Sequence, residues 1–102
     1  MTGRTSIYVE GFGHKNPIPA AARIGNIVAS GIIYGLDVAT GKPAASLEEQ
    51  ARLMFQHLKT IVEAAGGSVD DILKLNLWMV DRGKREAVNA EWLAMFPDAA
   101  SR

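Results

Sequence analysis

The sequence predicts a single α+β domain in which two helices pack on one face of a mainly antiparallel sheet. Two stretches, 46–65 and 85–96, carry apolar residues at helical spacing. Shorter stretches alternate in polarity or flank a turn dipeptide, as strands do. The chain has 102 residues of even composition, so we expect one domain over residues 1–102. Helices and strands in these proportions bury their apolar faces best as two layers.

The first half of the chain is expected to form strands. Residues 6–10 alternate in polarity, and residues 11–19 form a loop because they contain two glycines and two prolines. Two apolar runs, 20–24 and 27–34, flank Gly25-Asn26. A dipeptide of this kind predicts a tight two-residue hairpin.

A second turn at residues 40–43 leads into the long helix at 46–65. Ser46, with Glu49 three residues later, predicts a capping box in which each side chain accepts a hydrogen bond from the backbone of the other. Gly66-Gly67 then ends the helix, because glycine adopts the left-handed conformation at little cost.

The second half contains a short turn at 68–71, a strand at 72–80 and a helix at 85–96 that ends before Pro97. The strand alternates strictly. One predicted face holds Leu73, Leu75, Leu77 and Met79, and the other holds Lys74, Asn76 and Trp78. A sheet of this size leaves at least one open edge, and open edges favour pairing with further strands.

Composition excludes several classes of protein. Eleven basic residues balance eleven acidic ones, and this argues against non-specific nucleic-acid binding, which depends on excess positive charge. No apolar run is long enough to span a membrane, and the first ten residues do not resemble a secretory signal. The chain lacks cysteine, which removes thiol nucleophiles and fits a reducing cytoplasm.

The two histidines do not form a recognisable catalytic or metal site. His14 is a candidate for ligand contact because it lies in the glycine- and proline-rich loop, and loops carry binding residues. We expect His57 to be a surface or boundary residue beside the apolar stripe of the long helix. No partner stands at a spacing that would complete a triad or a metal site.

Two other places are candidates for binding. Gly31 falls inside a predicted strand, where glycine marks either a bulge or the close approach of a ligand, and Ser30 beside it offers a hydroxyl. Asn89 stands at the border of the apolar stripe of the second helix. Its amide either bonds to a neighbouring loop or helps to shape a pocket.

These and other segments, read together, resemble the RidA (YjgF, imine deaminase) family. The segments that carry the resemblance are Gly25-Asn26-Ile-Val-Ala-Ser30-Gly31, Ala39-Thr-Gly41-Lys-Pro43, Glu49-Gln50-Ala51, Ile61-Val-Glu-Ala-Ala-Gly66, Asp71-Ile72-Leu-Lys74 and Val88-Asn89. Their order and spacing match the family nearly from end to end.

The resemblance implies a chorismate-mutase-like α+β fold, a homotrimer, and ligand pockets in the clefts between subunits. It implies hydrolysis of reactive enamines and imines to 2-oxo compounds and ammonia, without a metal or organic cofactor. The family's older label is endoribonuclease L-PSP, and some members act on RNA or regulate translation. Ser30 and Gly31 match the Ser-Gly pair that lines the pocket, and Asn89 matches the helix asparagine.

The chain departs from the family at two places. Ile18, which we count among the substrate-binding positions, stands where many members have a tyrosine in the glycine- and proline-rich loop. Family members continue through a Pro-Ala-Arg segment into two further strands, and they place a carboxylate-binding arginine and a late glutamate there. The sequence reaches Arg102, so these two groups fall beyond it and the catalytic residues are unknown. We therefore expect a domain that is incomplete at its C-terminal side relative to the family.

Two hypotheses follow from the resemblance. The first is an enamine or imine deaminase. The alternative is a non-catalytic protein of the same fold that binds a small ligand or associates with RNA.

Overall fold

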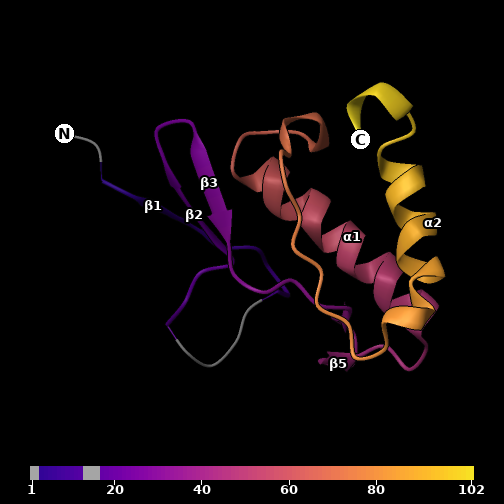
Figure 1. Ribbon diagram of the computed structural model, residues 1–102. Coiled ribbons are helices and arrows are strands. Elements are labelled where there is room, and N and C mark those ends of the chain that lie inside the picture. The colour runs from indigo at the N-terminus through magenta and orange to yellow at the C-terminus, as the bar shows by residue number, and fades with distance from the viewer. Residues whose placement is uncertain (1–2, 13–16) are drawn as a thin grey trace.

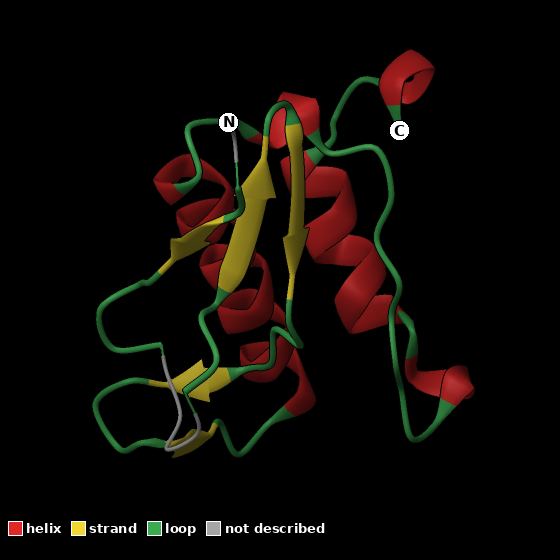
Figure 2. Ribbon diagram, turned by 90° about the vertical axis from the view of Figure 1, so that its left-hand side faces the viewer, coloured by secondary structure: helices red, strands yellow, loops and turns green. Residues whose placement is uncertain are grey.

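The computed structural model describes residues 3–12 and 17–102. Its strands form one layer, and both helices lie behind them (Figure 2). The α+β class with two helices on one side of antiparallel strands is therefore confirmed. His14 and part of the predicted loop 11–19 lie outside the described residues.

The main sheet has the order β1-β2-β3 and is antiparallel throughout. Its strands are β1 (Thr5–Ile7), β2 (Ala21–Ile24) and β3 (Ile27–Ser30). The last residue of β2 pairs with the first residue of β3, which leaves Gly25-Asn26 as a two-residue turn. Gly25 has a φ of 56°, as such a turn requires, so the predicted hairpin is confirmed.

A second, two-stranded sheet consists of β4 (Leu36–Asp37) and β5 (Lys42–Pro43). The turn between them places Gly41 at a φ of 73°. The Asp37 carboxylate accepts a hydrogen bond of 2.9 Å from the backbone N–H of Ala39, which closes the turn locally.

Helix α1 (Leu47–Ala64) is the central element of the fold. The Ser46 hydroxyl accepts a bond of 3.1 Å from the Glu49 backbone N–H, as predicted. The reciprocal half of the capping box is wrong, because the Glu49 carboxylate bonds to the Arg52 guanidinium instead. Beyond the helix, Gly66 has a φ of 93° and ends it as expected.

Helix α2 (Glu86–Met95) ends before Pro97, as predicted, and packs against α1. Single 3₁₀ turns at Val69–Asp71, Arg82–Lys84 and Ala99–Ser101 connect the remaining segments. Two groups of buried residues form the core and meet along α1. One group joins α1 to the strands and comprises Ile7, Phe12, Ala21, Leu36, Ile61 and Ala65. The other joins α1 to α2 and comprises Ala51, Phe55, Leu58 and Val88.

The predicted strand 72–80 needs correction. The segment is extended, but it has no strand partner among the described residues. The predicted faces are also only partly right: Ile72, Leu75 and Met79 pack on the core, whereas Leu73 is 99% exposed. Alternation in the sequence specifies two faces, but a strand also needs a hydrogen-bonding neighbour, which alternation cannot supply.

Candidate functional site

Three of the predicted binding residues lie at one end of the β2–β3 hairpin. The Gly31 N–H donates a bond of 3.0 Å to the Ala20 carbonyl, which extends the ladder one residue beyond both strands. Ile18 precedes Ala20 by two residues, so it lies at the same end as Ser30 and Gly31. All three residues are exposed, Ile18 by 54%.

The glycine at position 31 is not explained by contacts within the chain. β3 pairs with β2 residue for residue, so the bulge that was one explanation for Gly31 is absent from this hairpin. An added Cβ at Gly31 would lie 3.9 Å from the Ala20 carbonyl oxygen, which is ordinary van der Waals contact. A methyl group would therefore fit here within a single copy of the chain.

Ser30 offers the free polar groups at this end of the hairpin. Gly31 and Ala20 form a hydrogen-bonded pair, and pairs of this type alternate along antiparallel strands. Ser30 opposite Ala21 is therefore a non-hydrogen-bonded pair, with its backbone N–H and C=O directed away from β2. Among the described residues, its hydroxyl and these two groups have no hydrogen-bond partner, so they are open to a ligand.

Asn89 lies elsewhere on the molecule. It is exposed on α2, and its carboxamide makes no hydrogen bond to the described part of the chain. Bonding to a neighbouring loop, which was one explanation for Asn89, is therefore not observed. Figure 1 shows α1 between β3 and α2, so one copy does not bring Asn89 to Ser30. The Arg102 guanidinium donates to the carbonyls of Phe96 and Pro97.

The expectation for His57 is wrong, because this side chain is buried, with 9% exposed. Its Nε2 lies 2.7 Å from the Leu36 carbonyl oxygen and donates to it, and its ring lies 4.9 Å from the Phe12 ring. His57 therefore holds β4 against α1. The signal was present in the sequence: His57 precedes Ile61 by four residues, which places both on one face of the helix.

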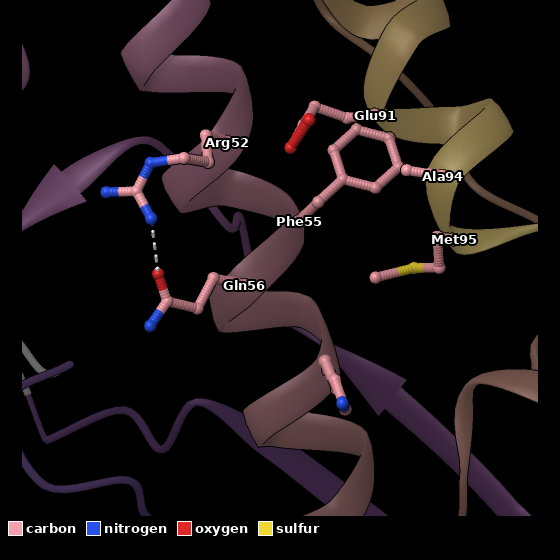
Figure 3. Close-up of a pocket in the computed structure, with 7 residues that line it drawn as sticks. Arg52, Phe55, Gln56, Glu91, Ala94 and Met95 are labelled. Atoms are coloured by element: carbon pink, nitrogen blue, oxygen red, sulfur yellow. Dashed lines mark hydrogen bonds between the residues drawn. The ribbon is translucent and has the colours of Figure 1, made fainter.

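A shallow groove of about 360 Å³ runs between the two helices (Figure 3). Phe55 points from α1 toward Ala94 and Met95 on α2, whereas Arg52 and Gln56 turn to the other side of α1. Arg52 is already held by the Glu49 carboxylate and donates a bond of 3.2 Å to Gln56. The hydrogen bond from Arg52 lowers the pKa of Glu49. Arg52 is therefore already paired, and the residues that line the groove include no hydroxyl or thiol side chain.

The described residues contain no cluster of three His, Cys, Asp or Glu side chains that could hold a metal ion. Over the same residues, no helix has both the length and the apolar character needed to cross a membrane.

A model of the family described as "Endoribonuclease L-PSP" matches residues 7–102. The chain belongs to this family, which is also known as the RidA or YjgF family. A "RutC family protein" from Haemophilus influenzae is 33% identical over 82 residues, which cover 80% of this chain and 63% of that protein. A "2-iminobutanoate/2-iminopropanoate deaminase" from Salmonella typhimurium is also 33% identical, over 80% of this chain and 64% of its own length.

Two solved structures show the same fold. A RidA crystal structure from the Antarctic bacterium Psychrobacter sp. PAMC 21119 superposes with a TM-score of 0.81 at 27% identity, over 88% of this chain and 74% of that one. The yeast protein YEO7 superposes with a TM-score of 0.85 at 18% identity, over 98% and 79%, which shows likeness of fold alone. The chain spans less than two thirds of the length of the curated relatives named above.

Proposed function

We propose that the protein acts in the cytoplasm as an enamine or imine deaminase, with its pocket in a cleft between copies of the chain. The observation that carries this proposal is the 33% identity to the Salmonella deaminase over 80% of the chain. The reaction adds water across a C=N bond, and the collapse of the adduct gives a 2-oxo compound and ammonia.

This hydrolysis needs few catalytic groups from the protein. The imine carbon is already electrophilic, so a site need only orient the substrate and a water molecule and stabilise developing charge. Ser30 suits this role, because its hydroxyl and its outward backbone groups are exposed. Gly31 leaves space beside it, and Ile18 would form an apolar wall. Asn89 would come from a neighbouring copy, since one copy does not place it near Ser30.

The exposed apolar surface supports assembly as a homotrimer. Ile24 and Ile27 at the turn of the hairpin and Ile32 beyond β3 are all more than half exposed. A soluble monomer rarely leaves so many large apolar side chains in water on one element. Analytical ultracentrifugation should find a species of about three times the 11.0 kDa chain mass. A stable monomer at micromolar concentration would contradict the trimer.

The activity is tested by release of ammonia and 2-oxo acid from an imine generated enzymatically in the same vessel. Two forms are compared: the 102-residue chain and a chain continued through a Pro-Ala-Arg segment. Without a cation to hold the substrate carboxylate, the shorter form loses a charge-assisted hydrogen bond worth about 1.5–3 kcal/mol. We therefore expect weak or no activity from the shorter form and clear activity from the longer one.

Gly31→Ala in the active form tests the site itself. The added methyl group meets nothing closer than 3.9 Å within a copy, so unfolding should be unchanged while kcat/KM falls. Gly3→Ala is the matched control, because an added Cβ there meets nothing within 4 Å. Equal activity of both variants would remove Gly31 from the pocket. Inactivity of both unsubstituted forms would favour the non-catalytic protein that binds a small ligand or associates with RNA.

A further inference from the structure

His57 is the one buried polar or charged residue within residues 3–12 and 17–102. Its Nε2 donates to the Leu36 carbonyl at 2.7 Å, and its ring lies 4.9 Å from the Phe12 ring at an interplanar angle of 43°. A buried imidazole costs free energy unless its N–H is bonded. The ring is therefore held by two contacts on different segments of the chain.

Both contacts of this histidine belong to the buried group that joins α1 to the strands. Ala20 and Ile33 pack against the same group. Ala20 carries the carbonyl that accepts the Gly31 N–H, and Ile33 follows Gly31 by two residues. The chain on either side of Gly31 therefore rests on this group, which forms the floor of the candidate site.

The connection from Gly31 to Leu36 is short and closely packed. Ile33 contacts the floor, and the backbone at Gly35 lies so close to α1 that an added Cβ would be 2.5 Å from the Gln50 Cα. Packed segments transmit a displacement, whereas loose loops absorb it. A shift of the Leu36 carbonyl should therefore reach Gly31.

A hydrogen bond adds to the floor what apolar contacts lack. Hydrophobic burial is not directional, so it does not by itself fix β4 at one position along α1. A hydrogen bond weakens steeply when its angle departs from linear, so it does fix this position. The Arg23 guanidinium makes a comparable link at the end of α1, where it donates to the Ala65 carbonyl at 2.8 Å. His57 makes its link beneath the candidate site.

We propose that His57 is a positioning residue of the candidate site, and that its hydrogen bond to Leu36 sets the position of Gly31. His57 is buried, so it acts through the floor and not by contact with the substrate. The inference rests on the proposed function for the location of the pocket. A displacement of about 1 Å in a reacting complex can cost about a hundredfold in rate, so a small shift of the floor should be visible in catalysis.

Two substitutions separate the hydrogen bond from the packing. His57→Gln places an amide N–H at nearly the reach of Nε2, so it still donates to the Leu36 carbonyl. His57→Phe keeps a ring against Phe12 but leaves this carbonyl without its donor. Phe55→Leu is the control, because Phe55 is also buried on α1 but points toward α2, away from the floor (Figure 3).

Two measurements are made on each variant. The NMR chemical shift of the Gly31 amide reports on its bond to Ala20 and needs no activity. The second measurement is kcat and KM for the imine, in the form of the protein that shows deaminase activity. His57→Phe should shift the Gly31 amide and lower kcat at least about tenfold, with less change in KM, because the bound substrate is misoriented. His57→Gln should keep both measurements near those of wild type. Phe55→Leu should lower the unfolding temperature without changing either.

Three results would overturn the inference: His57→Phe leaves the Gly31 amide or the kcat of an active protein unchanged, His57→Gln loses as much kcat as His57→Phe, or Phe55→Leu changes both measurements to the same extent. If His57→Phe does not fold, His57→Met takes its place, because its flexible thioether fills the space and donates no N–H. If neither folds, the bond is required for the fold itself and the inference is wrong. If wild type shows no deaminase activity, the proposed function fails, whereas the Gly31 amide still tests the positioning.

Discussion

The β2–β3 hairpin and the run 73–80 are both rich in apolar residues but have different structures. Both are short, both are rich in β-branched or large apolar residues, and both are extended. The hairpin is paired because Gly25-Asn26 returns the chain directly onto itself, which makes the partner strand local. Run 73–80 follows a helix and a 3₁₀ turn, so no neighbouring segment in the described part of the chain folds back onto it. Alternation indicates a strand, but the connection determines whether the strand is paired.

The same contrast applies to burial. β2 packs on α1 through Ala21, which belongs to the buried group around Ile61. Run 73–80 contributes Leu75 and Met79 to the other group but leaves Leu73 almost fully in water. Substitutions in the two regions should therefore have very different effects on stability.

The largest expected effect is that of Ile61→Ala. Ile61 is 1% exposed beneath the paired strands, and loss of its side chain should lower the free energy of unfolding by about 2–5 kcal/mol. The matched substitution Leu73→Ala in the unpaired run should change it by no more than about 0.5 kcal/mol. Urea denaturation followed by circular dichroism measures both. A large loss for Leu73→Ala would mean that this side chain is covered in solution.

The next effect concerns two glycines on either side of the β3–β4 connection. A Cβ at the buried Gly35 would lie 2.5 Å from the Gln50 Cα, so α1 and the strand would have to separate. Overpacking of this kind costs about 1–3 kcal/mol. Gly31→Ala, only four residues earlier, should leave thermal unfolding unchanged. If Gly35→Ala were equally harmless, the close approach of β4 to α1 would be wrong.

Features set by neighbouring residues could be predicted from the sequence. Helix α1, the end of α2 before Pro97 and the Gly25-Asn26 turn depend on caps, breakers and periodicity within a few residues. That run 73–80 has no strand partner among the described residues could not be predicted, because pairing depends on contacts distant in sequence. The spacing of His57 to Ile61 indicated its burial, but the hydrogen bond to Leu36, 21 residues away, could not be predicted.

The candidate site could be predicted from the sequence only in part. The hairpin brings Ser30, Gly31 and Ile18 to one end because the ladder continues to Ala20. Asn89 lies apart from these three residues, because helix α1 stands between α2 and the strands. The site proposed above draws on more than one copy, and the order of residues in one chain does not specify contacts between copies.

Ser46→Ala should have a smaller effect than either core substitution. The Ser46 hydroxyl accepts the Glu49 N–H, one of the donors that a helix start leaves unpaired. Removing it should lower stability by about 1 kcal/mol, whereas Ser46→Asp, which keeps an accepting oxygen, should restore most of the loss. The free energies of unfolding of wild type, Ser46→Ala and Ser46→Asp test this prediction. An unchanged value for Ser46→Ala would exclude a stabilising cap.

The smallest expected effect is the pH dependence that Glu49 contributes. The hydrogen bond from Arg52 lowers the pKa of Glu49 in the folded chain below its ordinary value. A lowered folded-state pKa means that the unfolded chain binds the proton more readily. The contribution is therefore complete above the ordinary pKa of glutamate and is lost as the pH falls through the lowered one. Both partners are exposed, so the effect should be slight and should weaken with salt.

Wild type should thus exceed Glu49→Gln in stability at pH 7, and the difference should vanish in acid. Lys74→Gln in the unpaired run is the control: Lys74 makes no ion pair with the described residues, so its removal should introduce no acid-dependent difference. A gap between wild type and Glu49→Gln that persisted at the lowest pH would show that Glu49 stabilises α1 by something other than its charge.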